Sequence, residues 1–434
     1  GSTHAIVLFR NSDGNTYVYD PWNAHVLGEN SLAAVGATAS IFELLVGFSM
    51  SLGAGFSIVI ARAFGSGETH KMKKAVAGSI EIGIFTTLVL TILSMFLLKP
   101  LLVLIDTPQE IMDQALAYIS VIGYFVFVMF AYNLCSGILR SIGNSFMPLV
   151  FLVFSSLLNI VLDYACMAWF NMGVAGAAIA TVISQGISAV LCIIYMITKV
   201  KEVVPQKEDF AWDSEMMKDL AGQGYAMAFM GSIVSIGSII LQSGINGLGT
   251  KIIAGHVAAR KVYALMNLPF ISIGVALSTF IGQNKGSNQV ERILRAMKYA
   301  YLFDVVFAAV CSLILWFSAP SLIHLISGSS DPTIIGNGSK FLYVVGPFYA
   351  VLGMLMQTRF ALQGLGSKIL PLFSSVIECV GKILFTMFLI PMFQYDAVIW
   401  CEPIIWCLML IELLISFEYN SYIKDIKKQM KLKV

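Results

Sequence analysis

Apolar segments long enough to cross a bilayer recur along the chain from Ser31 onward. A helix of about 20 apolar residues spans the hydrocarbon core of a membrane. Segments that meet this requirement lie at 32–61, 75–98, 111–139, 147–169, 174–198, 220–247, 252–282, 297–319, 334–362, 369–393 and 397–420. The pattern predicts an all-α polytopic membrane protein with eleven clear transmembrane helices.

Residues 1–30 break this pattern, because they are polar and contain a turn signal at 11–14 and a break at Asp20-Pro21. We interpret this region as the atypical or truncated remnant of a first span. The chain begins with Gly1 rather than methionine and carries no basic-then-apolar signal sequence. We therefore expect a fragment at this end. An even number of spans would place both termini on the same side of the membrane, so we expect that a twelfth, first span belongs to the complete protein.

The amino-acid composition is typical of a protein that is embedded in the lipid bilayer. Hydrophobic residues make up 58% of the 434 residues and charged residues 12%, whereas soluble domains average about 45–50% and about 25%. Nucleic acid is not indicated as a partner. The seven cysteines are scattered through apolar segments without metal-type spacing, so we interpret them as small buried hydrophobes. We expect no cofactor and no enzymatic activity, since phosphate-loop and His-Glu-x-x-His motifs are absent from the sequence.

The basic residues between the spans fall almost entirely on one side. The other side has only Lys99, Lys251 and Lys340. Because cytoplasmic loops are enriched in Lys and Arg, we expect the rich side and the basic tail 425–434 to be cytoplasmic. The basic residues on the rich side are Arg62, Lys71, Lys73, Lys74, Arg140, Lys199, Lys201, Lys207, Lys218, Lys285, Arg292, Arg295, Lys298, Lys368, Lys424, Lys427, Lys428, Lys431 and Lys433.

The two halves of the chain resemble each other. The polar segment 200–215 separates an N-terminal lobe, 31–199, from a C-terminal lobe, 216–424. A shift of 221 residues superposes Gly65-Ser66, Lys71 and Lys74 on Gly286-Ser287, Arg292 and Arg295, and a shift of 223 superposes Leu139, Gly143 and Pro148 on Leu362, Gly366 and Pro371. This pattern predicts two six-helix lobes related by a parallel repeat, an arrangement that suits a transporter with a central cavity.

One carboxylate stands out within an apolar segment of the first lobe. Asp163 lies four residues after Asn159, so both share one face of a helix, and Thr181 lies near the start of the next apolar segment. An ionisable side chain in a span is costly and often marks an ion or proton site, whereas the alternative is a hydrogen bond between helices. We expect these three oxygen-bearing side chains to converge on an ion or proton site.

Other charges in the spans leave two interpretations open. Glu43 either lines a cavity of the first lobe or pairs locally. Glu378 and Lys382 are four residues apart, which favours a mutual ion pair over a role in a cavity. We expect Arg260-Lys261 and Arg359 to face water or a cleft between the lobes, because exposure to lipid is expensive.

Several short motifs in order resemble the multidrug and toxic compound extrusion (MATE) family, specifically its bacterial DinF-like branch. The resemblance covers Gly28 to about Tyr422 and rests on Leu27-Gly28, 32–36, the basic loop after Gly65, 139–144, Asn159 with Asp163, 173–181, 282–284, 362–366 and Glu402-Pro403. Each motif is weak alone, and their order on the repeat makes the signal specific.

The resemblance implies a monomeric antiporter of the bacterial plasma membrane, with a V-shaped cavity, that exports organic, often cationic, compounds in exchange for sodium ions or protons by alternating access. Asp163, Asn159 and Thr181 match the family's cation-coupling residues, and Asp20 is the candidate for its first-span aspartate. Other branches use carboxylates in the seventh and tenth spans. Here 224–247 contains none, and the tenth span offers Gln357 and Arg359 as candidate cavity-lining residues beside Glu43.

Two alternatives stay open from the sequence. A lipid-linked oligosaccharide flippase of the wider superfamily shares the two-lobe plan, and a cleft lined with Arg260, Lys261 and Arg359 would favour it. The other alternative is that the chain as given is a truncated member of the family, which transports nothing because its first span is missing.

Overall fold

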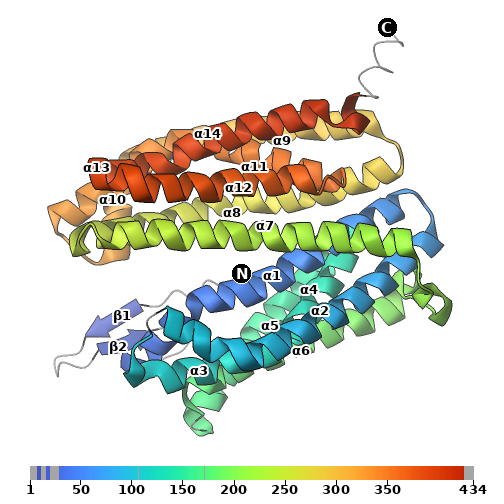
Figure 1. The fold of residues 1–434 in the computed structure, drawn as a ribbon, viewed down its shortest axis with the longest axis horizontal. Helices are drawn as coiled ribbons and strands as arrows, with labels where there is room; N and C mark the ends of the chain where they lie inside the picture. Colours follow the sequence, from blue (N-terminus) through green and yellow to red (C-terminus); the bar gives the residue numbers. More distant parts are fainter. Residues whose placement is uncertain (1–6, 11–15, 20–28, 106, 171, 425–434) are drawn as a thin grey trace. The chain divides into compact units, whose positions relative to one another are not determined.

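The computed structural model describes residues 7–10, 16–19, 29–105, 107–170 and 172–424 (Figure 1). Contacts divide the chain into two compact units. The N-terminal unit comprises Gly1–Ile60 and Glu68–Ala228, and the C-terminal unit comprises Ala61–Gly67 and Phe229–Val434. Asp20 lies outside the described residues.

Helices make up most of the N-terminal unit, and the last turn of its first helix belongs to the C-terminal unit. The α-helices are α1 (Glu29–Gly65), α2 (Thr69–Leu104), α3 (Gln109–Tyr124), α4 (Val126–Ser141), α5 (Phe146–Tyr164) and α6 (Gly173–Lys199). Between α5 and α6 lies a π-helix, η1 (Ala165–Trp169), and two short 3₁₀ helices follow α6, η2 (Lys201–Val203) and η3 (Lys207–Phe210).

The C-terminal unit repeats this order, and α7 runs from one unit into the other. Its α-helices are α7 (Ser214–Asn246), α8 (Thr250–Gly286), α9 (Val290–Ser327), α10 (Pro332–Val345), α11 (Tyr349–Gly364), α12 (Ile369–Leu384), α13 (Ile390–Phe393) and α14 (Tyr395–Tyr419). A 3₁₀ turn, η4 (Gly346–Phe348), separates α10 from α11, and a π-helix, η5 (Phe385–Leu389), follows α12.

The eleven predicted spans are confirmed in the described part of the chain. Ten helical stretches are long and apolar enough to cross a membrane, and the eleventh is the pair α3 and α4, which is bent by 47° at Phe125. Large apolar side chains such as Phe96, Trp316 and Phe317 are exposed. Their exposure fits a surface that faces lipid rather than water. The protein is therefore a multi-pass membrane protein.

The described residues before Glu29 form β structure. Strands β1 (Val7–Arg10) and β2 (Thr16–Tyr19) pair as an antiparallel hairpin in which Val7 lies opposite Tyr19. The segment interpreted from the sequence as the remnant of a first span thus contains two short strands.

The backbone confirms the parallel repeat. Six of the eight residues with positive φ in the described part of the chain form pairs at the predicted shifts, although most residues avoid this conformation. Two π-helices, η1 and η5, also lie 220 residues apart and follow equivalent helices. The positive-φ pairs are Gly67 with Asn288, Gly143 with Gly366, and Gly173 with Gln394.

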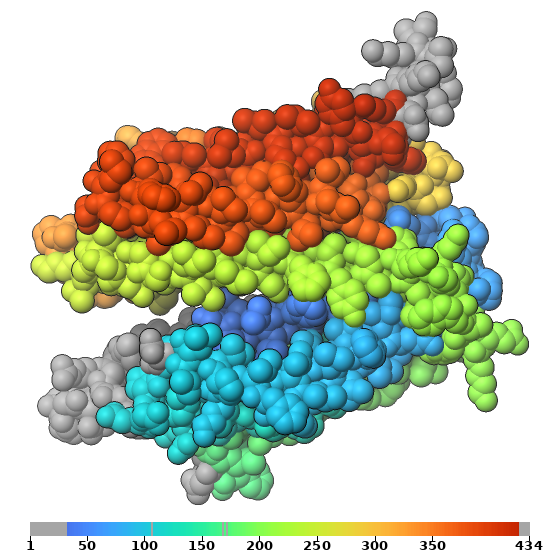
Figure 2. Space-filling model, viewed as in Figure 1, coloured from blue at the N-terminus to red at the C-terminus, as the bar shows by residue number. Residues whose placement is uncertain are grey.

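Within each unit, one helix contacts several others. In the N-terminal unit α6 packs on α3, α4 and α5, whereas in the C-terminal unit α8 packs on α9, α10 and α11, and α14 packs on α11 and α12. Figure 2 shows the closely packed side chains of α12 and α14 in orange to red. Each unit therefore buries its own apolar core.

The ends of α1 and α8 cross at two glycines that are related by the repeat. A Cβ atom on Gly65 would lie 2.0 Å from the carbonyl oxygen of Gln283, and one on Gly286 would lie 2.1 Å from the carbonyl oxygen of Arg62. Both distances are far shorter than van der Waals contact, and the obstructing atoms belong to the backbone. Only residues without a Cβ atom permit this crossing.

We predict that Gly286→Ala destabilises the protein by about 1–3 kcal/mol, because the backbones of α1 and α8 must move apart. Thermal unfolding of the purified protein in detergent should show a lower melting temperature. Gly336→Ala in α10 is the matched control, since a Cβ atom there would meet nothing within 4 Å and alanine favours a helix. Equal melting temperatures for the two variants would contradict the importance of the crossing.

Candidate functional site

Asn159 and Asp163 lie together on α5, as their spacing predicts. The side-chain amide of Asn159 donates to Oδ1 of Asp163 at 3.5 Å. Asp163 is only 5% exposed, while Asn159 is half-buried. The amide dipole therefore stabilises negative charge on a carboxyl group that is shielded from solvent.

The backbone changes form directly after Asp163. Helix α5 ends at Tyr164 and continues as the π-helix η1. A Cβ atom on Gly176 of α6 would lie 3.1 Å from the Cβ of Cys166, so a larger residue there would crowd α6 against this turn. π-Helical turns are rare in proteins, but those that do occur often lie at functional sites. The Asn159–Asp163 pair thus lies beside an irregular backbone segment held closely by α6.

Thr181 lies on α6, the helix that packs on α5. Its hydroxyl donates to the carbonyl oxygen of Ala177 at 2.9 Å. A hydroxyl oxygen keeps lone pairs after it has donated its proton, so Thr181 retains the capacity to bind a cation. Its membership of the site stays a prediction, as does that of Asp20, which the structure does not describe. Glu43 is an exposed residue of α1.

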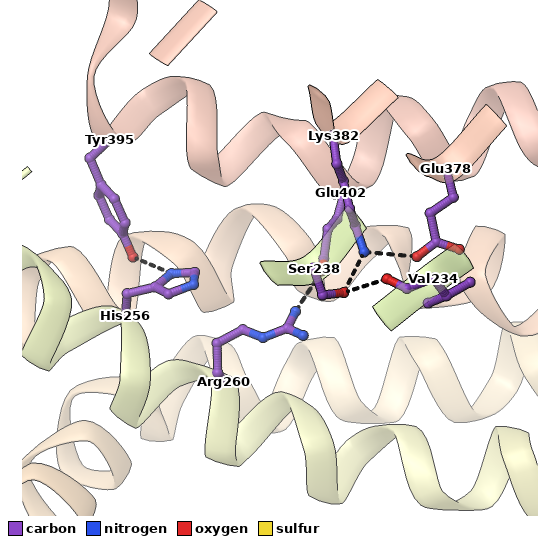
Figure 3. Close-up of polar contacts among 8 residues, drawn as sticks. All are labelled: Val234, Ser238, His256, Arg260, Glu378, Lys382, Tyr395 and Glu402. Atoms are coloured by element: carbon purple, nitrogen blue, oxygen red, sulfur yellow. Dashed lines mark hydrogen bonds and ion pairs between the residues drawn. The ribbon is translucent and has the colours of Figure 1, made fainter. Parts of the chain in front are cut away.

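A second group of charged side chains lies within the C-terminal unit. We call Arg260, Arg359, Glu378, Lys382 and Glu402 the C-terminal charge cluster. One guanidinium nitrogen of Arg260 donates to both carboxylate oxygens of Glu402, at 2.7 and 2.8 Å (Figure 3). The Arg260 guanidinium also lies 4.4 Å from the ring centroid of Tyr263. Arg260 on α8 and Glu402 on α14 therefore tie two helices together.

The predicted ion pair between Glu378 and Lys382 is confirmed. The ammonium group of Lys382 lies 2.8 Å from Oε1 of Glu378 and donates to Ser238 of α7 at 3.0 Å (Figure 3). Both side chains are buried on α12. The pair thus neutralises a charge that neither residue could carry alone at low cost.

We expected Arg359 to face either water or a cleft. The expectation that it faces water is wrong. Arg359 is buried, its Nε donates to Ser374 at 3.1 Å, and its guanidinium lies 3.7 Å from the second carboxylate oxygen of Glu378. Because Glu378 balances its charge, Arg359 is held inside the unit. Arg260 keeps 37% of its side chain exposed, and Lys261 is exposed.

Gln357 leads to a residue that sequence reasoning missed. It has no exposed surface, and its amide donates to Oδ1 of Asp304 at 3.2 Å and to the carbonyl oxygen of Phe270 at 3.3 Å. Asp304 lies on α9 and is also fully buried. The signal was present in the sequence, since Asp304 is the only acidic residue in the predicted span 297–319. The lining of a cavity by Gln357 and Arg359 stays a prediction.

Breaking the buried pair of the C-terminal charge cluster should be costly. We predict that Glu378→Gln destabilises the protein by about 3–5 kcal/mol, because Lys382 and Arg359 lose their carboxylate. Asp396→Asn is the control, since it removes a carboxylate from the exposed pair with Lys340 and such pairs contribute little. Melting temperatures in detergent test this difference, and a similar loss in both variants would contradict it.

Comparison with known proteins agrees with this architecture. The MatE family model matches residues 20–165 and 226–388. The probable multidrug resistance protein YpnP of Bacillus subtilis is 24% identical over 346 residues, which cover 79% of this chain and 76% of that protein. The multidrug export protein MepA of Staphylococcus saprophyticus is 23% identical over 406 residues, covering 91% and 86%.

A solved structure supports the fold. The crystal structure of a MATE protein in its bent conformation superposes with a TM-score of 0.85 at 23% identity, covering 93% of this chain and 90% of that one. The DinF-like branch stays a prediction. The family model covers most of the sequence in two stretches, one in each half of the repeat, and the chain therefore belongs to the MatE family.

Proposed function

We propose that this chain is a secondary active transporter that exports organic, often cationic, compounds across a bacterial plasma membrane in exchange for sodium ions or protons. Membership of the MatE family supports this proposal, as do relatives named as multidrug resistance and multidrug export proteins. The basic loops and tail support a cytoplasmic C-terminus. Alternating access moves the substrate when the cation and the substrate prefer different conformations.

The buried Asn159–Asp163 pair is the observation that carries the proposal. Asp163 is 5% exposed and lies inside a span, where an ionised carboxylate is costly. A bound sodium ion or proton neutralises that carboxylate. The free energy of cation binding then depends on whether the conformation exposes Asp163 to water, and this dependence couples the cation gradient to transport.

The chemistry of the three side chains suits a monovalent cation. Asp163 supplies a single negative charge, whereas Asn159 and Thr181 supply neutral oxygen atoms. In this conformation the nitrogen of the Asn159 amide points at Asp163. When sodium binds, this amide turns over to present its oxygen instead. A proton requires no such change, because it adds directly to the carboxylate.

The paired arginines lower the support for a lipid-linked oligosaccharide flippase. An anionic pyrophosphate group requires basic side chains whose charge is not already compensated. Arg260 binds Glu402, and Arg359 lies beside Glu378. Two of the three basic residues that favoured this alternative therefore have carboxylate partners, and Lys261 is left.

We predict that Asp163→Asn abolishes efflux of ethidium driven by a sodium or proton gradient, since asparagine cannot take up or release the coupling cation. Efflux from energised cells or proteoliposomes measures this effect. Asp396→Asn, which changes an exposed aspartate of α14, should transport at the wild-type rate. Undiminished efflux by Asp163→Asn would refute the role of Asp163.

A further inference from the structure

Asp304 carries a carboxyl group within a membrane-spanning helix, and only one of its two carboxyl oxygens has a hydrogen-bond partner among the residues that the structure describes. It lies seven residues inside the predicted span 297–319, which corresponds to about 10 Å from the end assigned to the cytoplasm. Oδ1 of Asp304 accepts from the amide of Gln357, whereas Oδ2 has no hydrogen-bond partner. The side-chain oxygen of Gln357 also has none. Two hydrogen-bonded neighbours in the described part of the chain therefore each keep one buried oxygen atom without a donor.

The surroundings of Asp304 provide no compensating positive charge. Phe270 of α8 contributes an aromatic ring and a carbonyl oxygen that already accepts from Gln357. The nearby Tyr301 on α9 and Thr358 on α11 bond to each other at 2.6 Å. No ion pair joins Asp304 to a basic side chain among the described residues. The carboxyl group thus faces neutral groups from every helix that contacts it in these interactions.

The internal repeat shows what this position requires for packing alone. The shift of 221 relates Asp304 of α9 to Gly83 of α2, and the shift of 223 relates Gly353 and Gln357 of α11 to Phe130 and Leu134 of α4. A Cβ atom on Gly83 would lie 2.1 Å from the ring of Phe130, and one on Gly353 would lie 2.7 Å from the carboxyl carbon of Asp304.

In both units, therefore, a side chain from one helix fills the space left by a glycine on the other. The N-terminal unit fills it with an aromatic ring, and the C-terminal unit fills it with a carboxyl group. Close packing at this crossing needs no ionisable group. Packing alone therefore does not explain why position 304 carries a carboxyl group.

An ionised carboxylate in such surroundings is costly unless a cation compensates its charge. We propose that Asp304 and Gln357 form a second monovalent-cation site, in the C-terminal unit, which takes up either a proton or a sodium ion. A proton adds to Oδ2 of Asp304. A sodium ion binds between Oδ2 of Asp304 and the side-chain oxygen of Gln357, the two atoms that lack partners.

This site differs from the Asn159–Asp163 pair in its residues and its unit. A role of the Asp304–Gln357 site in transport rests on the proposed antiport function. Binding of a cation at this site does not depend on that function. Asp304 also lies on the ninth of the twelve spans in the repeat plan, whereas the sequence analysis looked for carboxylates on the seventh and tenth spans.

Counting the cations bound by the purified, full-length protein in detergent tests the proposal. One arm measures binding of radioactive ²²Na⁺, and the other measures protons released when the pH is raised in the absence of sodium. We expect Asp304→Asn to bind one cation fewer per chain in one of the two arms, which identifies the ion. Asparagine preserves the shape of the side chain and an oxygen that accepts from Gln357.

The control Asp396→Asn should leave both counts unchanged. If Asp304→Asn fails to fold, the double variant Asp304→Gly with Gly353→Phe replaces it, because this pair reproduces the packing of Gly83 and Phe130. Unchanged counts in both arms for the folded variant would overturn the proposal and leave Asp304 as a hydrogen-bond acceptor. Neither arm contains a drug, so a wild-type protein that fails to export ethidium would contradict the proposed function without affecting this result.

Discussion

The cost of charge in a low-dielectric environment determines how the polar side chains of this protein are arranged. Water is absent from the core of a bilayer, so a buried charge needs an opposite charge, a set of dipoles or a bound ion. The C-terminal charge cluster uses opposite charges, with Glu402 against Arg260 and Glu378 between Lys382 and Arg359. Asp163 and Asp304 each accept a hydrogen bond from a carboxamide. The neutral amide of Gln357 leaves the carboxylate of Asp304 with a negative charge, which a mobile cation can compensate.

Comparison of the two halves of the repeat distinguishes the backbone features that the fold requires from the polar side chains that differ between the halves. Both halves place residues with positive φ and π-helical turns at equivalent positions, even where the residue type differs, as in Gly173 and Gln394. Backbone geometry is therefore common to the two units. The polar side chains are not shared, since Asp304 and Gln357 have Gly83 and Leu134 as their counterparts. Ionisable groups were thus placed in each unit without altering its helices.

The spans and the repeat could be predicted from the sequence because both depend on local patterns of apolar residues, glycine and basic loops. The contact between Asn159 and Asp163 is also local, one helical turn apart, and it was predicted. Arg260 and Glu402 are separated by 142 residues, and no local pattern reveals such a pair. Arg359 was misjudged because the distance to Glu378 depends on how α11 and α12 pack. Asp304 was missed because its span contains no second polar signal at helical spacing.

The two cation sites proposed here, one in each half of the repeat, would together have a thermodynamic consequence if both are occupied in each transport cycle. Exchange of two monovalent cations for one singly charged drug moves a net positive charge inward in each cycle. The membrane potential then contributes to export, by about 2.3 kcal/mol per 100 mV for each charge. A roughly tenfold cation gradient could also sustain a roughly hundredfold drug gradient, because the two cation free energies add. Under this proposal, a carboxyl group in place of a phenyl ring at one helix crossing sets the stoichiometry of the cycle and the steepest drug gradient that the protein can maintain.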